Sequence, residues 1–172
     1  MSLQNEIALV TGASRGIGLA IALELGRQGA RVVGTATSES GAAAIESVLK
    51  ENGVTGSGKV LDVTRPESVE ALLQDLEKSS GAPSILVNNA GITRDGLMLR
   101  MSEDDWNTIL NTNLTSVYRL SKACLRPMTK ARKGRIISIA SVVAATGNAG
   151  QANYAAAKAG IIGFTRSLAR EV

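Results

Sequence analysis

The sequence predicts a doubly wound α/β fold, in which a parallel sheet carries helices on both faces. Short apolar runs alternate with longer segments of helical periodicity along the chain, and this alternation is typical of β-α-β units. The runs are continuously apolar, as expected for strands buried on both faces. The 172 residues, with no repeat or long linker, suit a single domain over residues 1–172.

The first strand is expected over Ile7–Val10, because four apolar residues precede a glycine-rich turn. A helix over Gly16–Gln28 would place Ile17, Ile21 and Leu25 on one face and stop at Gly29. The next predicted elements are a strand over Arg31–Ala36, a helix over Ala42–Glu51, a glycine-rich loop over Asn52–Gly58 and a third strand over Val60–Val63.

Thr64 and Glu67 have the spacing of a capping box, so the next helix is predicted to start at Thr64 and run to about Lys78. A fourth strand, Ile85–Val87, ends at Asn88-Asn89-Ala90-Gly91. Ser102 with Asp105 supports another helix start. The helical pattern then continues, with or without a break, to about Lys130, and Arg135–Ile139 and Asn153–Arg170 follow as the fifth strand and last helix.

Composition narrows the possible functions. Aromatic residues make up only 2% of the chain, so Ala, Val, Ile and Leu must form the core. With no histidine and one cysteine, Cys124, neither an intrachain disulfide nor a metal site is expected, and a reducing compartment is indicated. No signal peptide and no apolar run of about 18 residues is present. These features predict a cytoplasmic protein with no membrane partner.

The net charge of +4 raises the question of an acidic partner or nucleic acid. Nucleic-acid binding is disfavoured, because the basic residues are scattered and the few aromatics form no stacking series. The one dense basic run comprises Arg126, Lys130, Arg132, Lys133 and Arg135. Its simplest interpretation is a solvated helix end, where cations lie near the last carbonyl groups.

A glycine turn, Thr11-Gly12-Ala13-Ser14-Arg15-Gly16-Ile17-Gly18, joins the first strand to the first helix. Many such turns contain glycine, but three glycines at this junction favour a dinucleotide site of the Rossmann type. Gly12 permits the tight turn, Gly16 lets the backbone approach a pyrophosphate at the positive end of the helix, and Gly18 allows close packing.

The end of the second strand predicts the cofactor. Sites that prefer NAD place a carboxylate there for the ribose 2′-hydroxyl, whereas Val33–Ser38 contains none. Arg15 could pair with a 2′-phosphate, and Thr37 could add a hydroxyl contact. These residues predict NADPH/NADP+, against the alternative that Arg15 is merely a solvated side chain.

Tyr154 and Lys158 are four residues apart, so they share one helix face. A tyrosine ordinarily titrates near pH 10, and a neighbouring ammonium favours its phenolate. Ser141 lies at the end of the fifth strand, where ligands bind in open α/β sheets, and its hydroxyl could hold a substrate carbonyl. The same spacing often marks only an amphipathic surface pair, but here it follows a strand-end serine.

Together, the glycine turn, Asn88–Gly91, Asn113, Ser141 and the Tyr154/Lys158 pair resemble the short-chain dehydrogenase/reductases over essentially the whole chain. Longer stretches at Gly91–Asp95, Leu120–Ala123 and Gly147–Gly160 are similar to one branch, the bacterial 3-oxoacyl-[acyl-carrier-protein] reductases of type II fatty acid synthesis. The resemblance implies an NADP-dependent oxidoreductase that converts 3-oxoacyl-[acyl-carrier-protein] to 3-hydroxyacyl-[acyl-carrier-protein].

The resemblance also implies roles for individual residues. Tyr154 would be the proton donor, Lys158 would assist it and hold the ribose, Ser141 would orient the carbonyl, and Asn113 would hold a water in a proton relay. Arg132 would dock the acyl carrier protein, and the helices around Asn113–Lys130 and Asn153–Arg170 would form a homotetramer. The cofactor would be bound by Gly12, Ser14, Arg15, Gly16, Ile17, Gly18, Thr37, Asp62, Val63, Asn89, Ala90, Gly91, Tyr154 and Lys158.

The family continues beyond the point that corresponds to Val172, with a further strand, a Pro-Gly motif, a substrate-covering segment and a last strand. The sheet is therefore expected to lack its C-terminal strand or strands and to expose an edge. Two alternatives stay open: a related reductase of another ketone or alcohol, and a catalytically inactive nucleotide-binding fragment.

Overall fold

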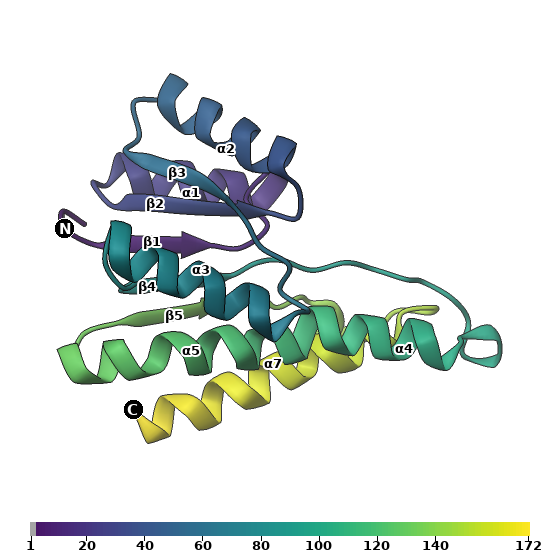
Figure 1. Cartoon of the computed structure of the whole chain (residues 1–172). Helices are drawn as coiled ribbons and strands as arrows, with labels where there is room; N and C mark the ends of the chain where they lie inside the picture. The colour runs from purple at the N-terminus through teal and green to yellow at the C-terminus, as the bar shows by residue number, and fades with distance from the viewer. Residues whose placement is uncertain (1–2) are drawn as a thin grey trace.

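A computed structural model describes residues 3–172 and shows an α/β fold around a five-stranded sheet (Figure 1). The strands lie in the order β3-β2-β1-β4-β5, and every neighbouring pair is parallel. Their bounds are β1 Ile7–Val10, β2 Arg31–Ala36, β3 Gly56–Val60, β4 Ile85–Asn88 and β5 Arg135–Ser138. The predicted doubly wound parallel sheet is confirmed.

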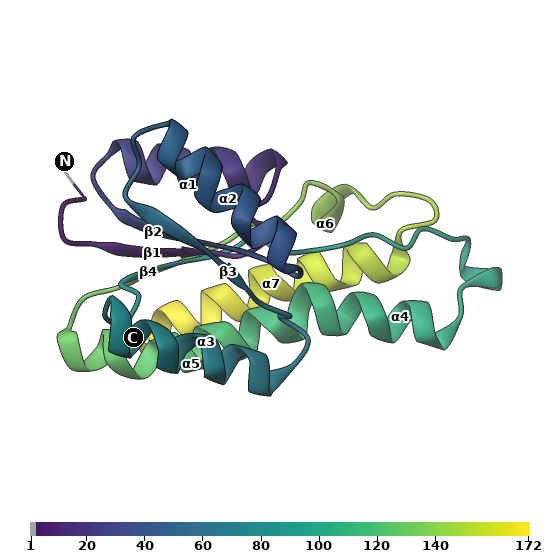
Figure 2. The ribbon, with the colours of Figure 1, turned by 45° about the horizontal axis from the view of Figure 1, so that its top comes forward.

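Helices cover both faces of the sheet (Figures 1 and 2). On one face, α1 (Gly16–Arg27) and α2 (Glu39–Glu51) pack against Ala8, Val10 and Val87; on the other, α3 (Pro66–Ser79) and α5 (Ser116–Ala131) pack against Leu9 and Leu86. Neighbouring residues of one strand therefore belong to opposite cores, which explains why the strands are continuously apolar.

The strand order reverses between β1 and β4. The chain adds β2 and then β3 on one side of β1, and it returns to place β4 and β5 on the other side. In open α/β sheets, ligands bind beyond the carboxyl ends of the strands at such a switch point. The segments that follow β1 and β4 therefore meet at the edge where a cofactor is expected.

The third strand was predicted in the wrong place. It spans Gly56–Val60 and not Val60–Val63, so the end of the predicted glycine-rich loop, Gly56 to Gly58, is strand. The glycines are required by the close approach of α2 and β2: a Cβ on Gly58 would lie 1.8 Å from the Ala42 carbonyl oxygen, and one on Gly56 would lie 2.3 Å from that of Val32.

The predicted capping box at Thr64 is also wrong. The Thr64 hydroxyl donates a hydrogen bond of 2.6 Å to Asp62 and does not cap the helix. The helix α3 begins at Pro66. Arg65 occupies the N-cap position, and its side chain makes no capping hydrogen bond. Proline suits this position because it has no N–H to satisfy and its φ is already helical.

The helical segment from Ser102 to Ala131 contains one irregularity. Ser102 caps α4 (Glu103–Leu110) by accepting a 3.0 Å hydrogen bond from the Asp105 amide, as predicted. A π-helical turn, η2 (Asn111–Thr115), then joins α4 to α5. Such turns widen the backbone locally and often occur at functional sites, and this one contains Asn113.

Several other details differ from expectation. Ile17 is 64% exposed, so it does not belong to the core-facing side of α1, where the buried residues are Gly18 and Ala22. The short helices η1 (Met98–Arg100) and α6 (Val143–Thr146) were not predicted. The last helix, α7 (Ala152–Glu171), agrees with its predicted range within one residue at each end.

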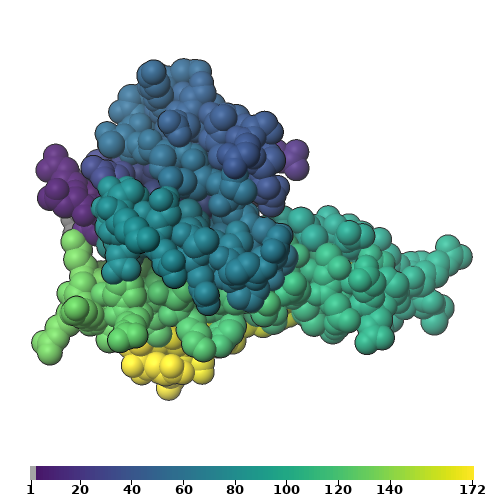
Figure 3. All heavy atoms as spheres, in the orientation of Figure 1, coloured from purple at the N-terminus to yellow at the C-terminus, as the bar shows by residue number. Residues whose placement is uncertain are grey.

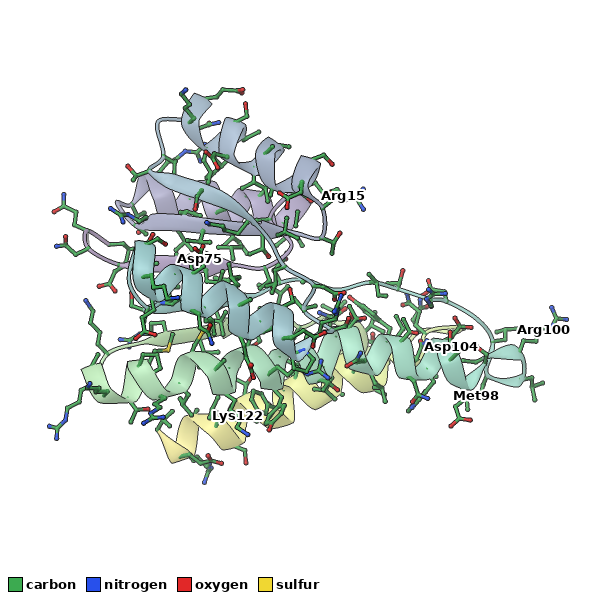
Figure 4. The ribbon with its side chains drawn as sticks, in the orientation of Figure 1. Arg15, Asp75, Met98, Arg100, Asp104 and Lys122 are labelled. Atoms are coloured by element: carbon green, nitrogen blue, oxygen red, sulfur yellow. The ribbon has the colours of Figure 1, made fainter. Side chains whose placement is uncertain are left out.

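The segment before and within α4 protrudes from the rest of the molecule (Figure 3), beyond the carboxyl ends of the strands (Figure 1). Met98 and Arg100 lie near its tip and Asp104 lies at the start of α4 (Figure 4). β5 is an edge strand: it pairs only with β4 within the described residues, and Ile137 on it is 45% exposed. None of the helices within residues 3–172 has the length and apolar character to cross a bilayer.

Candidate active site

The turn between β1 and α1 is shaped by glycines in the left-handed region. Gly12 has a φ of 64° and Gly16 a φ of 59°, conformations that an L side chain adopts only with strain. Arg15 precedes α1 with an extended backbone, no side chain caps the helix, and no acidic residue lies in its first turn. The first amides of α1 and the positive end of its dipole are therefore suited to an anionic group.

A hydrogen-bonded clasp joins this turn to the segment after β4. The Asn89 side-chain amide donates to the carbonyl oxygens of Thr11 (2.9 Å) and Gly12 (3.0 Å). The buried Thr11 hydroxyl accepts from the amides of Asn89 (3.0 Å) and Ala90 (2.9 Å). The clasp fixes the glycine turn against β4. Sequence reasoning missed Thr11, whose only signal was a hydroxyl directly after a buried strand.

Gly18 lies where the clasp leaves no room for a side chain. A Cβ there would be 2.3 Å from the Gly12 carbonyl oxygen and 2.4 Å from the Asn89 amide nitrogen. Gly18 therefore allows α1 to approach the glycine turn and Asn89 closely. Gly16, by contrast, has open space where its side chain would be.

The ends of β2 and β3 line the same edge. Thr37 follows β2 and is exposed, and Ser38 caps α2 by accepting from the Gly41 amide at 3.1 Å. Arg15 projects outward at this end of the sheet (Figure 4). After β3, the half-buried Asp62 accepts hydrogen bonds from the amide (2.9 Å) and hydroxyl of Thr64. Buried Val63 follows it, with its carbonyl 3.5 Å from Arg119.

Lys158 is buried, with a relative exposure of 5%. Its ammonium donates a 2.6 Å hydrogen bond to the Ile139 carbonyl, just beyond the end of β5, and lies 5.7 Å from the centre of the Tyr154 ring. Burial lowers the pKa of Lys158 below its usual value, because the charged form is poorly solvated. The predicted pairing of Tyr154 with Lys158 on one helix face is therefore present.

Ser141 reaches the same end of the sheet from β5. Its hydroxyl accepts a 3.2 Å hydrogen bond from the Val143 amide and so begins α6, which packs against α7. Because Lys158 binds the carbonyl two residues before Ser141, the structure brings the end of β5 and the start of α7 together. Ser141 is half-buried, as is Tyr154.

Asn113 lies buried in the π-helical turn and holds the segment after β4. Its side-chain oxygen accepts from the Ile92 amide at 2.9 Å, and its side-chain nitrogen donates to the Ile92 carbonyl at 2.8 Å. A Cβ on Gly91 would lie 3.2 Å from the same side chain, so Gly91 suits this close contact. The water relay expected for Asn113 stays a prediction; the observed role is to fix Ile92.

A second tie fixes the segment beyond Ile92. The fully buried Asn153 donates a 3.0 Å hydrogen bond to the Arg94 carbonyl, and Gln151 donates to both oxygens of the Asp95 carboxylate at 3.0 and 3.1 Å. These bonds hold the start of α7, and with it Tyr154, beside the segment after β4. Sequence reasoning did not identify Asn153 or Gln151 as site-building residues.

Arg132 lies apart from the other predicted site residues. It ends α5 with a φ of 51°, just before β5 starts, and is therefore at the amino end of the strands. The neighbouring Lys133 forms an ion pair with Glu6. A hollow of about 630 Å³ lies here, between α5, β5 and α7, with Met128, Phe164 and Leu168 in its lining. It is distant from the cofactor-side edge.

Comparison with known proteins decides the family. The sequence profile of the short chain dehydrogenases matches residues 6–172. This chain is a short-chain dehydrogenase.

Similar short-chain dehydrogenases share most of this sequence. The chain is 68% identical to the 3-oxoacyl-[acyl-carrier-protein] reductase FabG of Pseudomonas aeruginosa, 63% to that of Vibrio harveyi and 60% to that of Escherichia coli. Each comparison covers 100% of this chain and 69–70% of the relative.

Short-chain dehydrogenases use a nicotinamide cofactor, and the residues present fit one. The uncapped start of α1 can take the pyrophosphate, open space at Gly16 leaves its approach clear, and the carboxyl ends of β2 and β3 flank the adenosine side. The buried lysine and the tyrosine beside it lie where the reacting end of the cofactor would be held.

Proposed function

We propose that this protein reduces 3-oxoacyl-[acyl-carrier-protein] to 3-hydroxyacyl-[acyl-carrier-protein] with NADPH, in fatty acid biosynthesis. The observation that carries the proposal is the sequence identity of 60–68%, over the whole chain, to three 3-oxoacyl-[acyl-carrier-protein] reductases. The arrangement of Tyr154, Lys158 and Ser141 at one edge of the sheet supports it, because reduction of a ketone needs a proton donor beside the carbonyl.

When bound, the reduced nicotinamide would supply the hydride for the 3-oxo carbon. The Tyr154 hydroxyl donates its proton to the carbonyl oxygen, and Ser141 donates a hydrogen bond that orients the same oxygen. The Lys158 ammonium, fixed by the Ile139 carbonyl, stabilises the phenolate that remains. Asn113 keeps the segment after β4 in place and takes part in returning a proton through water.

The cofactor is held by the residues of the glycine turn and by Thr37, Asp62, Val63, Asn89, Ala90 and Gly91, together with the catalytic pair. NADPH is preferred over NADH in this proposal. Two observations support that preference: no carboxylate occurs from Val33 to Ser38, and Arg15 projects outward beside the end of β2 (Figure 4). A guanidinium there can pair with a 2′-phosphate.

The carrier protein is proposed to dock at Arg132, an exposed cation at the end of α5. Since Arg132 lies at the amino end of the strands, a carrier protein bound there would have to deliver its thioester to the far edge of the same sheet or to another subunit. Homotetramer formation through α5 and α7 would offer the second route. Light scattering of the purified protein tests the assembly, and a monomer would contradict it.

The reducing compartment inferred from the sequence suits Cys124, which is a buried free thiol. We therefore propose a cytoplasmic location.

The test of the reaction is oxidation of NADPH in the presence of an acetoacetyl thioester, followed at the absorbance of the reduced nicotinamide. Tyr154→Phe removes only the proton donor, so we expect turnover to be abolished while NADPH binding is retained. Retained turnover would contradict the role of Tyr154. NADPH binding without turnover by the parent protein would instead support a nucleotide-binding fragment, and turnover only of unrelated ketones would support another reductase.

A further inference from the structure

Two adjacent asparagines lie at the end of β4, Asn88 as its last residue and Asn89 directly after it, and their side chains bind different neighbours. Asn89 binds the glycine turn, as described above. Asn88 is 4% exposed, and its side-chain nitrogen donates hydrogen bonds of 3.3 Å to the hydroxyls of Ser121 on α5 and Ser138 on β5. Three elements therefore meet at one polar cluster, in which Asn88 and Ser121 are buried and Ser138 is half-buried.

The Asn88 cluster places buried polar groups beside apolar side chains of α5. Ser121 is 1% exposed and lies on the face of α5 that also buries Leu120 and Cys124. The side-chain oxygen of Asn88 is buried and has no hydrogen-bond partner among the described residues. A buried acceptor left unpaired is costly, and leucine could fill similar space without that cost. Stability alone is therefore a poor explanation for Asn88.

The Asn88 cluster lies next to the carbonyl that holds Lys158. Asn88 pairs in register with Ser138, and the next amide, that of Ile139, donates to the Asn88 carbonyl at 2.9 Å. The carbonyl of the same residue, Ile139, accepts the 2.6 Å hydrogen bond from Lys158. One peptide unit thus separates the serine bound by Asn88 from the group that fixes the ammonium.

We propose that Asn88, Ser121 and Ser138 are positioning residues for Lys158. The cluster fixes the position of the carboxyl end of β5 against β4 and α5, so that the Ile139 carbonyl points at the ammonium. The end of β4 therefore positions both halves of the site. Asn89 holds the glycine turn in place, and Asn88 holds the catalytic lysine in place through β5.

The test removes single hydroxyls. Ser121→Ala and Ser138→Ala each delete one hydrogen bond of the Asn88 cluster, and Ser138→Thr keeps the hydroxyl. Cys124→Ala is the matched control, since it removes one heavy atom from the same buried face of α5 one turn away. The activity-independent readout is the proton exchange of the 15N-labelled Lys158 ammonium, measured by NMR and assigned by its loss in Lys158→Met.

We expect the two serine-to-alanine variants to accelerate exchange at Lys158 and to lower kcat by about tenfold, because small displacements of a catalytic group are costly. Ser138→Thr, which keeps the hydroxyl, should leave both properties as in the parent protein. Cys124→Ala should change thermal stability but neither readout.

The proposal is overturned if the serine variants match Cys124→Ala in exchange and kcat, or if their losses only follow the loss of thermal stability across all variants. The proposal rests on the proposed role of Lys158 in reduction. If the parent protein shows no turnover, the proposed function fails, while the exchange measurement still decides whether the Asn88 cluster positions the lysine.

Discussion

Replacing Gly18 with alanine tests the proposed cofactor turn at its tightest point. In an ordinary helix this change is favourable by about 0.5–1 kcal/mol, because alanine loses less conformational freedom on folding. At Gly18 the new Cβ would lie 2.3 Å from the Gly12 carbonyl oxygen and 2.4 Å from the Asn89 side-chain nitrogen. Both contacts are well inside van der Waals distance, so the turn or Asn89 must move.

The expected cost follows from two terms. Overpacking of a tight contact typically costs about 1–3 kcal/mol, and displacing Asn89 weakens two hydrogen bonds that contribute about 1 kcal/mol each. After the helix propensity gain, the net destabilisation is about 2 kcal/mol, which lowers the melting temperature of a domain this size by about 4–8 °C. NADPH binding should weaken at least about tenfold, because the displaced groups shape the turn.

The assay is thermal unfolding by circular dichroism together with NADPH titration by fluorescence. Gly163→Ala is the matched control: Gly163 is also helical, on α7, and has nothing within 4 Å of where its Cβ would lie. This control should gain stability and bind NADPH normally. If Gly18→Ala is as stable as Gly163→Ala and binds NADPH equally well, the steric reasoning about the turn is wrong.

Three further perturbations have defined outcomes. Arg15→Ala should weaken NADPH about tenfold or more while sparing NADH, and equal losses in competitive binding assays would show that Arg15 does not contact the 2′-phosphate. Hydrogen bonds from Lys133 and Ser84 lower the pKa of Glu6 below its ordinary value of 4.5. These bonds therefore stabilise the folded protein fully above pH 4.5, and the stabilisation is lost as the pH falls through the lowered pKa of the folded state. Glu6→Gln should therefore cost up to about 1 kcal/mol in urea unfolding at pH 7, and a cost that persists undiminished in strong acid would contradict this account. Burial raises the pKa of the Cys124 thiol to about 12, so a thiol reagent at pH 8 should label the protein only after unfolding; rapid labelling of the native state would refute that.

The sequence predicted the elements whose signals are local. The strands β1, β2, β4 and β5 are apolar runs bounded by turns, and the α1 and α7 ranges agree with the structure within one residue at each end. Tyr154 and Lys158 could be paired in advance because four residues make about one helical turn. Ser102 could be assigned as a cap because its partner, the Asp105 amide, is three residues away.

Errors arose where the deciding contact comes from a distant residue. The glycines of β3 were assigned to a loop because nothing local shows that α2 approaches them closely. The Thr64 error is different, because its deciding contact is local: Asp62, two residues earlier, accepts the hydrogen bond of the hydroxyl. Ile17 fits the apolar period of α1 and is nevertheless exposed, because the sheet packs against the side of the helix that contains Gly18 and Ala22.

The sequence by itself therefore determined the fold class, the glycine turn and the proximity of Tyr154 to Lys158, since each depends on residues within one turn or one strand. Only the tertiary structure decided what holds them in place: Thr11 with Asn89, Asn113 with Ile92, Asn153 with Arg94, and Lys158 with Ile139. These partners are 19 to 78 residues apart. Polar groups buried by folding must find partners wherever the sheet and helices bring them, and that proximity is a property of the packed chain.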